Sequence, residues 1–162
     1  MLSTLTKVLL HDDAEESSGA VLQLVSFQLG HEIFAIDILD VQEIIRLGEI
    51  THVPNAPHDV EGMVNLRGKI IPIINLRARF GLCVTEPTKD TRVIVVEVAH
   101  VILGFIVDSV EEVLRIPEEC IEPLPPTGRG GADEWHRGVG RVNGRLVILL
   151  DLGRLFGIRT SD

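Results

Sequence analysis

The chain contains an internal repeat, which limits its possible folds more than any other feature. When the sequence is shifted by 76 residues, GKIIPIINLRARFG (68–81) aligns with GRLVILLDLGRLFG (144–157), with identical Gly, Leu, Phe and Gly residues. When it is shifted by 69 residues, DVQEIIR (40–46) aligns with SVEEVLR (109–115). Because the elements follow the same order in both halves, the sequence predicts one structural unit that occurs twice.

The repeated unit is rich in β-strand signals. Residues 22–29 (LQLVSFQL) and 92–101 (RVIVVEVAHV) contain many branched residues that partly alternate with polar ones, as in strands with one or both faces buried. The short apolar runs 70–74 and 146–150 each follow a glycine and a basic residue, which predicts a turn that leads into a buried strand. We therefore expect a mainly β fold.

Short helices are predicted after the two apolar runs. Asn75 and Asp151 can each cap a helix N-terminus, and Gly81 and Gly157, six residues later, can end the helix with a positive φ angle. We expect about two helical turns in each half. The phenylalanine just before each of these glycines is expected to be buried.

Each half has about 60 to 70 residues, a length at which a single hydrophobic core is marginal. We therefore expect the two halves to pack on each other, and exchange of strands between them is left open. The predicted organisation is a flexible N-terminal tail at 1–20, one domain at 21–159 with a first repeat at 21–83 and a second at 90–158, and a C-terminal tail at 160–162.

Charge and composition narrow the range of partners. The chain has 15 Lys and Arg against 24 Asp and Glu, a formal net charge of −9. A protein that binds a polyanion usually has a basic patch, so we expect no nucleic acid among the partners. The longest apolar runs, such as 146–150, are far shorter than the roughly 20 residues that cross a bilayer, so we expect no direct membrane insertion. Cys83 and Cys120 form no CxxC pair and are too few for a disulfide framework, which favours a reducing cytoplasm.

The sequence shows no pattern typical of catalysis or of cofactor binding. The histidines have no HExxH spacing, and GRGGAD (128–133) lacks the GK[ST] ending of a phosphate-binding loop. We therefore expect no cofactor, no metal and no catalytic residue. A small β-barrel enzyme that uses His58 and Asp59 stays open as a remote alternative, supported only by the adjacency of these two residues.

The repeat breaks at one informative place. In the 76-residue alignment, NLRG (65–68) lies opposite RVNG (141–144), so Arg67 faces Asn143 and its guanidinium exists in one half only. A folding requirement is more often met in both halves of a repeat than in one, and arginine is favoured at interface hot spots. Two interpretations stay open for Arg67: a partly exposed residue that binds a partner, or a salt bridge to the other half.

Taken in order, several segments of the chain resemble the CheW family of chemotaxis coupling proteins. The resemblance covers about 22–158 and is carried by LVSFQLG, FAIDILDVQEIIR, VPNAP, EGMVNLRGKIIPIINLRARFG and GFIVDSVEEVLRIP. It implies two pseudo-repeated, SH3-like five-stranded β-barrels packed around a shared core, with short helices and no active site. The loop at 123–135 aligns to no particular member of the family, so contacts to a kinase there stay in doubt.

The same resemblance implies partners. The family links the cytoplasmic tips of chemoreceptors to the regulatory domain of a chemotaxis histidine kinase, in membrane-associated arrays. Its partner-binding positions fall on Val41, Glu43, Gly62, Asn65 and Arg67 of this sequence. The expected function is therefore that of a cytoplasmic, non-catalytic adaptor. An adaptor of a non-flagellar or surface-motility pathway would share every one of these motifs.

Overall fold

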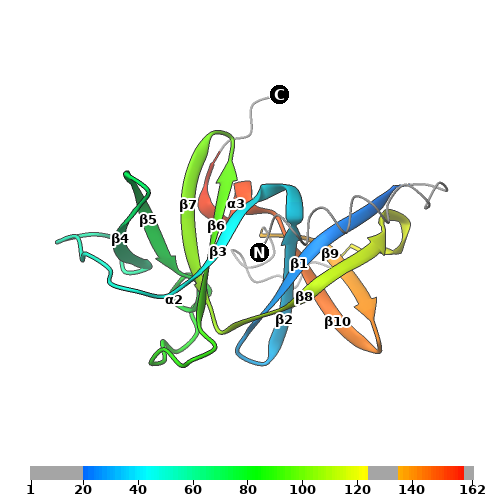
Figure 1. Cartoon of the computed structure of the whole chain (residues 1–162). Helices are drawn as coiled ribbons and strands as arrows, with labels where there is room; N and C mark the ends of the chain where they lie inside the picture. Colours follow the sequence, from blue (N-terminus) through cyan, green and yellow to red (C-terminus); the bar gives the residue numbers. More distant parts are fainter. Residues whose placement is uncertain (1–19, 124–134, 159–162) are drawn as a thin grey trace.

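The computed structural model describes residues 20–123 and 135–158. Within these residues the chain forms mostly β-strands, joined by turns, by helices of about one turn and by two longer loops at 47–59 and 80–91 (Figure 1). In chain order the elements are β1 (Val21–Leu29), β2 (Glu32–Asp37), the 3₁₀ turn η1 (Ile38–Asp40), β3 (Val41–Arg46), β4 (Val60–Leu66), β5 (Lys69–Asn75), α2 (Leu76–Arg79), β6 (Arg92–Val98), β7 (Val101–Val107), β8 (Ser109–Pro117), the 3₁₀ turn η2 (Glu118–Cys120), β9 (His136–Val142), β10 (Arg145–Leu150) and α3 (Leu152–Phe156).

The strands form two five-stranded sheets, and each sheet combines strands from both repeats. Sheet A has the order β8-β1-β2-β10-β9, and sheet B has the order β3-β6-β7-β5-β4. Because β1 to β5 correspond to β6 to β10 in the repeat, the two orders become identical when the halves are interchanged. Figure 1 shows β1 and β2 beside β8 and β10, away from the rest of their own half. The prediction of a mainly β fold with two five-stranded units is confirmed.

Parallel strand pairs join the two halves within each sheet. β10 pairs in parallel with β2, so that Ile148 lies opposite Phe34. β5 pairs in parallel with β7, so that Ile74 lies opposite Phe105. The other pairs are antiparallel. Each half therefore completes the sheet of the other, which explains how two units of marginal length share one stable structure.

Successive residues of the central strands face two different cores. In β1, Leu24 lies in the cluster of sheet A, whereas its neighbour Val25 lies in a core shared by both sheets. In β6, Val93 lies in the cluster of sheet B and Ile94 in the shared core. Strands that are buried on both faces need no strict polar alternation, which is why apolar residues stand next to each other in these segments.

All six aromatic residues of the chain form one continuous path through the shared core. The ring centroids of consecutive members lie between 4.9 and 5.9 Å apart, a separation at which aromatic pairs attract each other. This path connects the C-terminal end of α2 to the C-terminal end of α3. Its members are, in spatial order, Trp135, Phe80, Phe34, Phe27, Phe105 and Phe156.

The helices α2 and α3 begin after the predicted N-caps but are shorter than predicted. The side chains of Asn75 and Asp151 each accept a hydrogen bond from a backbone N–H three residues further on. Gly81 and Gly157 follow with φ angles of 77° and 69°. The helices contain only four and five residues, about one turn each, because the chain already turns away at the residue before each glycine or at the glycine itself.

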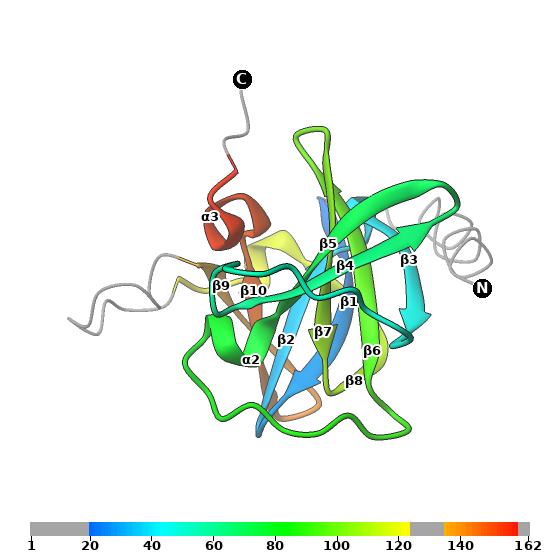
Figure 2. The same cartoon turned by 90° about the vertical axis from the view of Figure 1, so that its left-hand side faces the viewer.

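Phe80 and Phe156 are partly buried, so the expectation that both would be buried is wrong. Leu76 and Leu155, each 0% exposed, take the interior positions of α2 and α3. The two phenylalanines sit at the helix ends and cover the margin of the shared core. The connection from α2 to β6 then crosses the lower end of sheet B (Figure 2).

Candidate functional site

The hairpin turn between β4 and β5 holds Arg67 in a backbone conformation that arginine rarely adopts. Arg67 and Gly68 are its two central residues, with φ angles of 54° and 85°. Asn143 and Gly144 occupy the equivalent turn between β9 and β10, with φ angles of 53° and 79°. Asparagine tolerates this left-handed region much better than arginine does. The turn itself therefore favours asparagine at position 67, and arginine there has a conformational cost.

The guanidinium of Arg67 forms a bidentate ion pair with the carboxylate of Glu43 on β3. Nη1 donates to Oε2, and Nη2 donates to Oε1 at 3.0 Å. The side chain of Arg67 is 76% exposed and that of Glu43 is 21% exposed. The hydrogen bonds to Glu43 raise the pKa of Arg67. The expectation that Arg67 is at least partly exposed is confirmed, and its ion pair lies within the first half rather than across to the second.

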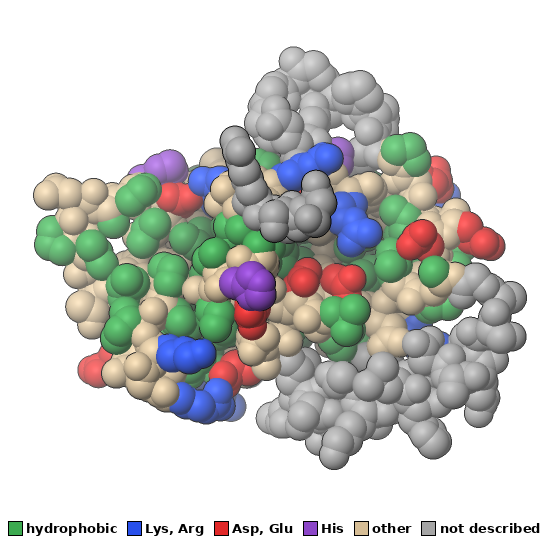
Figure 3. Space-filling view, turned by 90° about the horizontal axis from the view of Figure 1, so that it is seen from above, with side chains coloured by type: hydrophobic (Ala, Val, Ile, Leu, Met, Phe, Trp, Pro, Cys, Tyr) green, Lys and Arg blue, Asp and Glu red, His purple; other side chains and the backbone are tan. Residues whose placement is uncertain are grey.

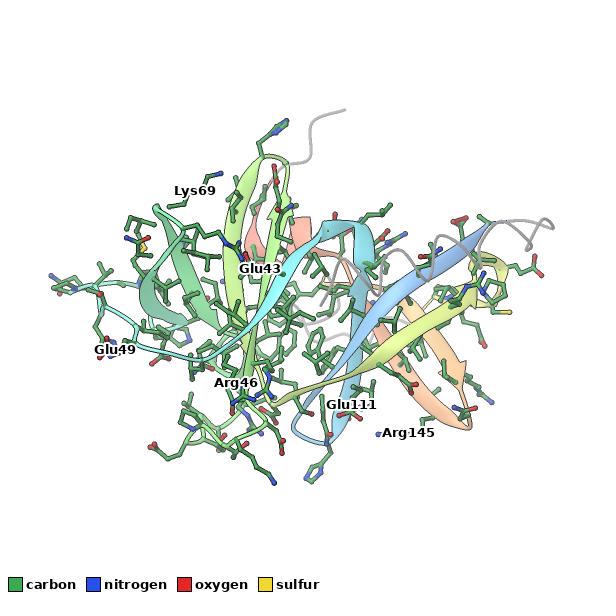
Figure 4. All side chains as sticks on the ribbon, in the orientation of Figure 1. Glu43, Arg46, Glu49, Lys69, Glu111 and Arg145 are labelled. Carbon is green, nitrogen blue, oxygen red and sulfur yellow. The ribbon has the colours of Figure 1, made fainter. Side chains whose placement is uncertain are left out.

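Asn65 supports the same turn from β4. Its side-chain Oδ1 accepts a hydrogen bond from the backbone N–H of Gly68 at 2.9 Å, and its side chain is exposed. Figure 4 shows Glu43 and Lys69 at the upper end of sheet B, the end where this turn lies. The structure therefore brings together three of the five predicted partner-binding residues, Glu43, Asn65 and Arg67.

Val41 and Gly62, the other two predicted residues, are buried and do not offer a direct contact surface. Val41 is 8% exposed and packs in the shared core. A Cβ atom at Gly62 would lie 2.3 Å from the backbone oxygen of Thr51, to which the neighbouring residue of β4 is bridged. Gly138, its repeat equivalent, is equally crowded, since a Cβ there would lie 2.7 Å from a backbone oxygen. A glycine required in both halves is explained by folding.

A groove of about 170 Å³ lies beside the Arg67–Glu43 pair, at the upper end of sheet B. The equivalent end of sheet A has a smaller groove of about 80 Å³ with Asn143 at its edge. Figure 4 labels Glu111 and Arg145, which line this second groove. The larger groove is lined by Gln42, Glu43, Leu66, Arg67, Lys69, Ile71, Val95 and Ile102.

Exposed apolar side chains near this end were not predicted as part of the site. Ile70 is 60% exposed and Val101 is 43% exposed, at the starts of the paired strands β5 and β7. Seen from above, hydrophobic side chains gather over the end of sheet B, with basic and acidic groups beside them (Figure 3). The repeat could have indicated this position, because both halves have a large apolar residue there. Leu146 aligns with Ile70 and is likewise exposed, at 56%.

The remote enzyme alternative gains no support from the geometry of Asp59. Its side chain is 9% exposed and accepts a hydrogen bond at 3.0 Å from Arg79 of α2, whereas His58 is exposed. Within residues 20–123 and 135–158, no group of three or more His, Cys, Asp or Glu side chains is arranged to hold a metal ion. In the same ranges, no helix is both long enough and apolar enough to cross a bilayer.

Comparison with known proteins identifies the family. The model of the CheW-like domain matches residues 23–159. The chain belongs to this CheW-like domain family. It is 40% identical over 136 residues to the chemotaxis protein CheW of Helicobacter pylori. The aligned residues cover 84% of this chain and 82% of that protein.

Two further relatives bear on fold and function. The crystal structure of the scaffolding protein TtCheW from Thermoanaerobacter tengcongensis matches with a TM-score of 0.78 and 36% identity, over 90% of this chain and 94% of that one. The protein PilI of Pseudomonas aeruginosa is 32% identical over 103 residues, 63% of this chain and 58% of that protein. Relatives of this chain therefore carry more than one protein name.

Proposed function

We propose that this chain is a non-catalytic chemotaxis adaptor that couples chemoreceptor tips to the regulatory domain of a histidine kinase. The relatives named CheW support a role in chemotaxis, and the matched crystal structure is that of a scaffolding protein. The identity of both partners comes from the family resemblance. On this proposal the chain acts in the cytoplasm and is recruited to membrane-associated receptor arrays.

The observation that carries the proposal is the placement of Arg67. This residue occupies a turn position where asparagine serves the fold in the other half, and its side chain is 76% exposed. An exposed ion pair contributes roughly 0 to 1 kcal/mol to stability, which gives the fold little reason to keep an arginine there. Binding to a partner provides that reason, because a planar guanidinium can donate several directional hydrogen bonds at an interface.

The proposed contact surface consists of Arg67, Glu43 and Asn65 together with the adjoining groove. Glu43 fixes the direction of the guanidinium, and Asn65 fixes the turn that carries it. Val41 and Gly62 would act through position: Val41 holds the start of β3 on the shared core, and Gly62 lets β4 approach Thr51. Changes at these two residues should disturb the surface without removing a direct contact.

The test reconstitutes receptor, histidine kinase and this chain, and measures receptor-dependent kinase phosphorylation and binding. Arg67→Ala should weaken binding about 30-fold, equal to roughly 2 kcal/mol, and abolish receptor control while the thermal midpoint stays unchanged. Arg154→Ala is the matched control, because Arg154 is 66% exposed and its one ion pair among the described residues is with Asp151, the N-cap of α3. Normal receptor control by Arg67→Ala would contradict the proposal, and a collapsed midpoint would point to a role in folding.

A second candidate is an adaptor of a non-flagellar chemosensory or surface-motility pathway. The similarity to PilI, a relative with a different name from the CheW proteins, favours keeping this candidate. The same reconstitution separates the two, because the chain should couple the receptor and kinase of one pathway and leave those of the other unlinked. Binding of both kinases with equal affinity would contradict an assignment to either pathway alone.

A further inference from the structure

A cavity of about 330 Å³ opens at the lower end of sheet B, opposite to the end that carries Arg67. Figure 4 shows Arg46, the last residue of β3, at this lower end. Leu47, Ile50 and Ile106 line the cavity and pack against the cluster of sheet B, so its inner part is apolar. The mouth of a β-barrel with an apolar interior and a few polar groups is a common place for a binding site.

The charged groups that line this cavity are unequal in number. Arg77 and Asp108 neutralise each other, since Nε and Nη2 of the arginine donate to the aspartate at 2.9 and 2.6 Å. Glu61 and Glu86 remain as acidic groups, and the only other ionisable side chain at the lining is the exposed His52. The site therefore carries an excess of negative charge.

Glu61 is partly buried and lacks a basic partner among the described residues. Its Oε1 accepts a hydrogen bond from the neutral side-chain amide of Asn75 at 3.2 Å, and no described ion pair includes it. The repeat places Arg137 at the equivalent position, so the fold does not require an acid there. A carboxylate that is partly withdrawn from water is stabilised when a cation pairs with it.

We propose that this cavity binds a lysine or arginine side chain of a polypeptide partner, with the cationic group at Glu61. The aliphatic stem of such a side chain would cover Leu47 and Ile106, as these stems do on other apolar surfaces. A polypeptide is favoured over a free amine because Val84, at the rim, is 60% exposed and would be covered by the residues that flank the lysine. The proposal does not depend on kinase coupling.

The test is a chemical-shift titration of the full isotopically labelled chain. The ligands are the peptide acetyl-Ala-Val-Lys-Val-Ala-amide, the same peptide with norleucine in place of lysine, and n-butylammonium chloride. The lysine peptide should shift the signals of Leu47, Ile50 and Ile106, which line the cavity, to saturation. The norleucine peptide and n-butylammonium should each bind at least about tenfold more weakly, the smallest effect expected for loss of a charge-assisted hydrogen bond or of the flanking contacts.

Two variants complete the test. Glu61→Gln keeps the size of the side chain and its contact to Asn75 but removes the charge, and should weaken the lysine peptide at least about tenfold. Glu111→Gln removes an exposed acid from sheet A and should leave the titration unchanged. The proposal is overturned if the lysine peptide causes no saturable shift, if norleucine binds equally well, or if Glu61→Gln binds as the unaltered chain does. Equal binding of n-butylammonium would overturn the assignment to a polypeptide.

Discussion

Three arginines of the first half have no arginine at the equivalent position of the second half. In the 76-residue alignment, Arg67, Arg77 and Arg79 lie opposite an asparagine, a glycine and a leucine. Each of the three forms an ion pair, but with different consequences. Arg77 and Arg79 connect the two halves from partly buried positions, whereas Arg67 is exposed and stays within its own half. A break in the repeat therefore marks both residues that serve the fold and residues that are free to bind a partner, and the burial of the side chain distinguishes the two.

Arg79 shows why a folding residue can occur in one half only. Its Nε and Nη2 donate to the backbone oxygen of Leu155 at 3.0 and 2.6 Å. Leu155 is the residue that aligns with Arg79 in the repeat, so the two equivalent positions meet where the halves face each other. Two arginines there would bring like charges together, which is unfavourable. The contact requires the two halves to differ, and folding alone explains the difference.

The largest effect is expected when Arg79 is made like its equivalent by Arg79→Leu. The change removes the partner of Asp59, which is 9% exposed, and leaves the oxygen of Leu155 without its donor. Each buried polar group left without its partner costs about 1 to 3 kcal/mol, and more when it is charged, so the midpoint of urea denaturation should fall sharply. Adding Asp59→Asn should recover part of the loss. A silent Arg79→Leu would contradict the distinction drawn between buried and exposed arginines.

A medium effect is expected at Arg77, with a defined dependence on pH. Burial acts to raise the pKa of Asp108, but hydrogen bonds from Arg77 and from the backbone of Gly30 outweigh it, so the pKa lies below its ordinary value of 3.8. A lowered folded-state pKa stabilises the fold above the unfolded-state pKa, and this contribution is lost as the pH falls through the folded-state value. The stability of the unaltered chain should therefore decline below about pH 4.

The variant Arg77→Leu isolates this contribution. It should cost about 2 kcal/mol at pH 7, in the range of hydrogen bonds to charged groups, and it should reduce the decline in stability at low pH. Both effects are measured by urea unfolding at a series of pH values from about 2 to 7, roughly the interval over which carboxylates titrate. An equally steep decline in the variant would show that other carboxylates control the acid transition.

The sequence predicted the elements of this fold better than their partners. The caps Asn75 and Asp151 and the glycines after the helices are local signals, and they lie where expected. Which strands pair is decided by long-range contacts, so the alignment of the halves left exchange open. The length of the helices was also set by packing, since the chain turns to place Phe80 against Phe34 and Trp135.

Strand pairing also limited what the sequence could say about the candidate site. Alternation along β3 puts Val41 and Glu43 on one face, and both were expected to bind partners. The register with β6 shifts between these two residues, and such an irregularity changes the face on which a side chain lies. Val41 therefore packs in the shared core while Glu43 reaches Arg67. A bulge depends on strand pairing and leaves no clear mark in the sequence.

The smallest change in stability, and the sharpest comparison of the two halves, is expected from exchanging the turn residues. Arg67→Asn gives the first turn the residue that the second turn has, which removes an arginine from the left-handed region at φ 54°. The strain relieved in the left-handed region exceeds the small contribution of the exposed Glu43 pair, so the thermal midpoint should rise slightly, by an amount equal to about 0.5 to 1 kcal/mol, while receptor control of the kinase is lost. Asn143→Arg should lower stability by a similar amount. It should not restore coupling to Arg67→Asn, because the groove beside position 143 is smaller, at about 80 Å³, and belongs to the other sheet.

Thermal denaturation and the reconstituted kinase assay measure both properties on the same four proteins. If Arg67→Asn lowers the midpoint, the turn needs arginine for folding; if the double variant regains receptor control, the two ends of the molecule are interchangeable and the difference between the halves is not functional.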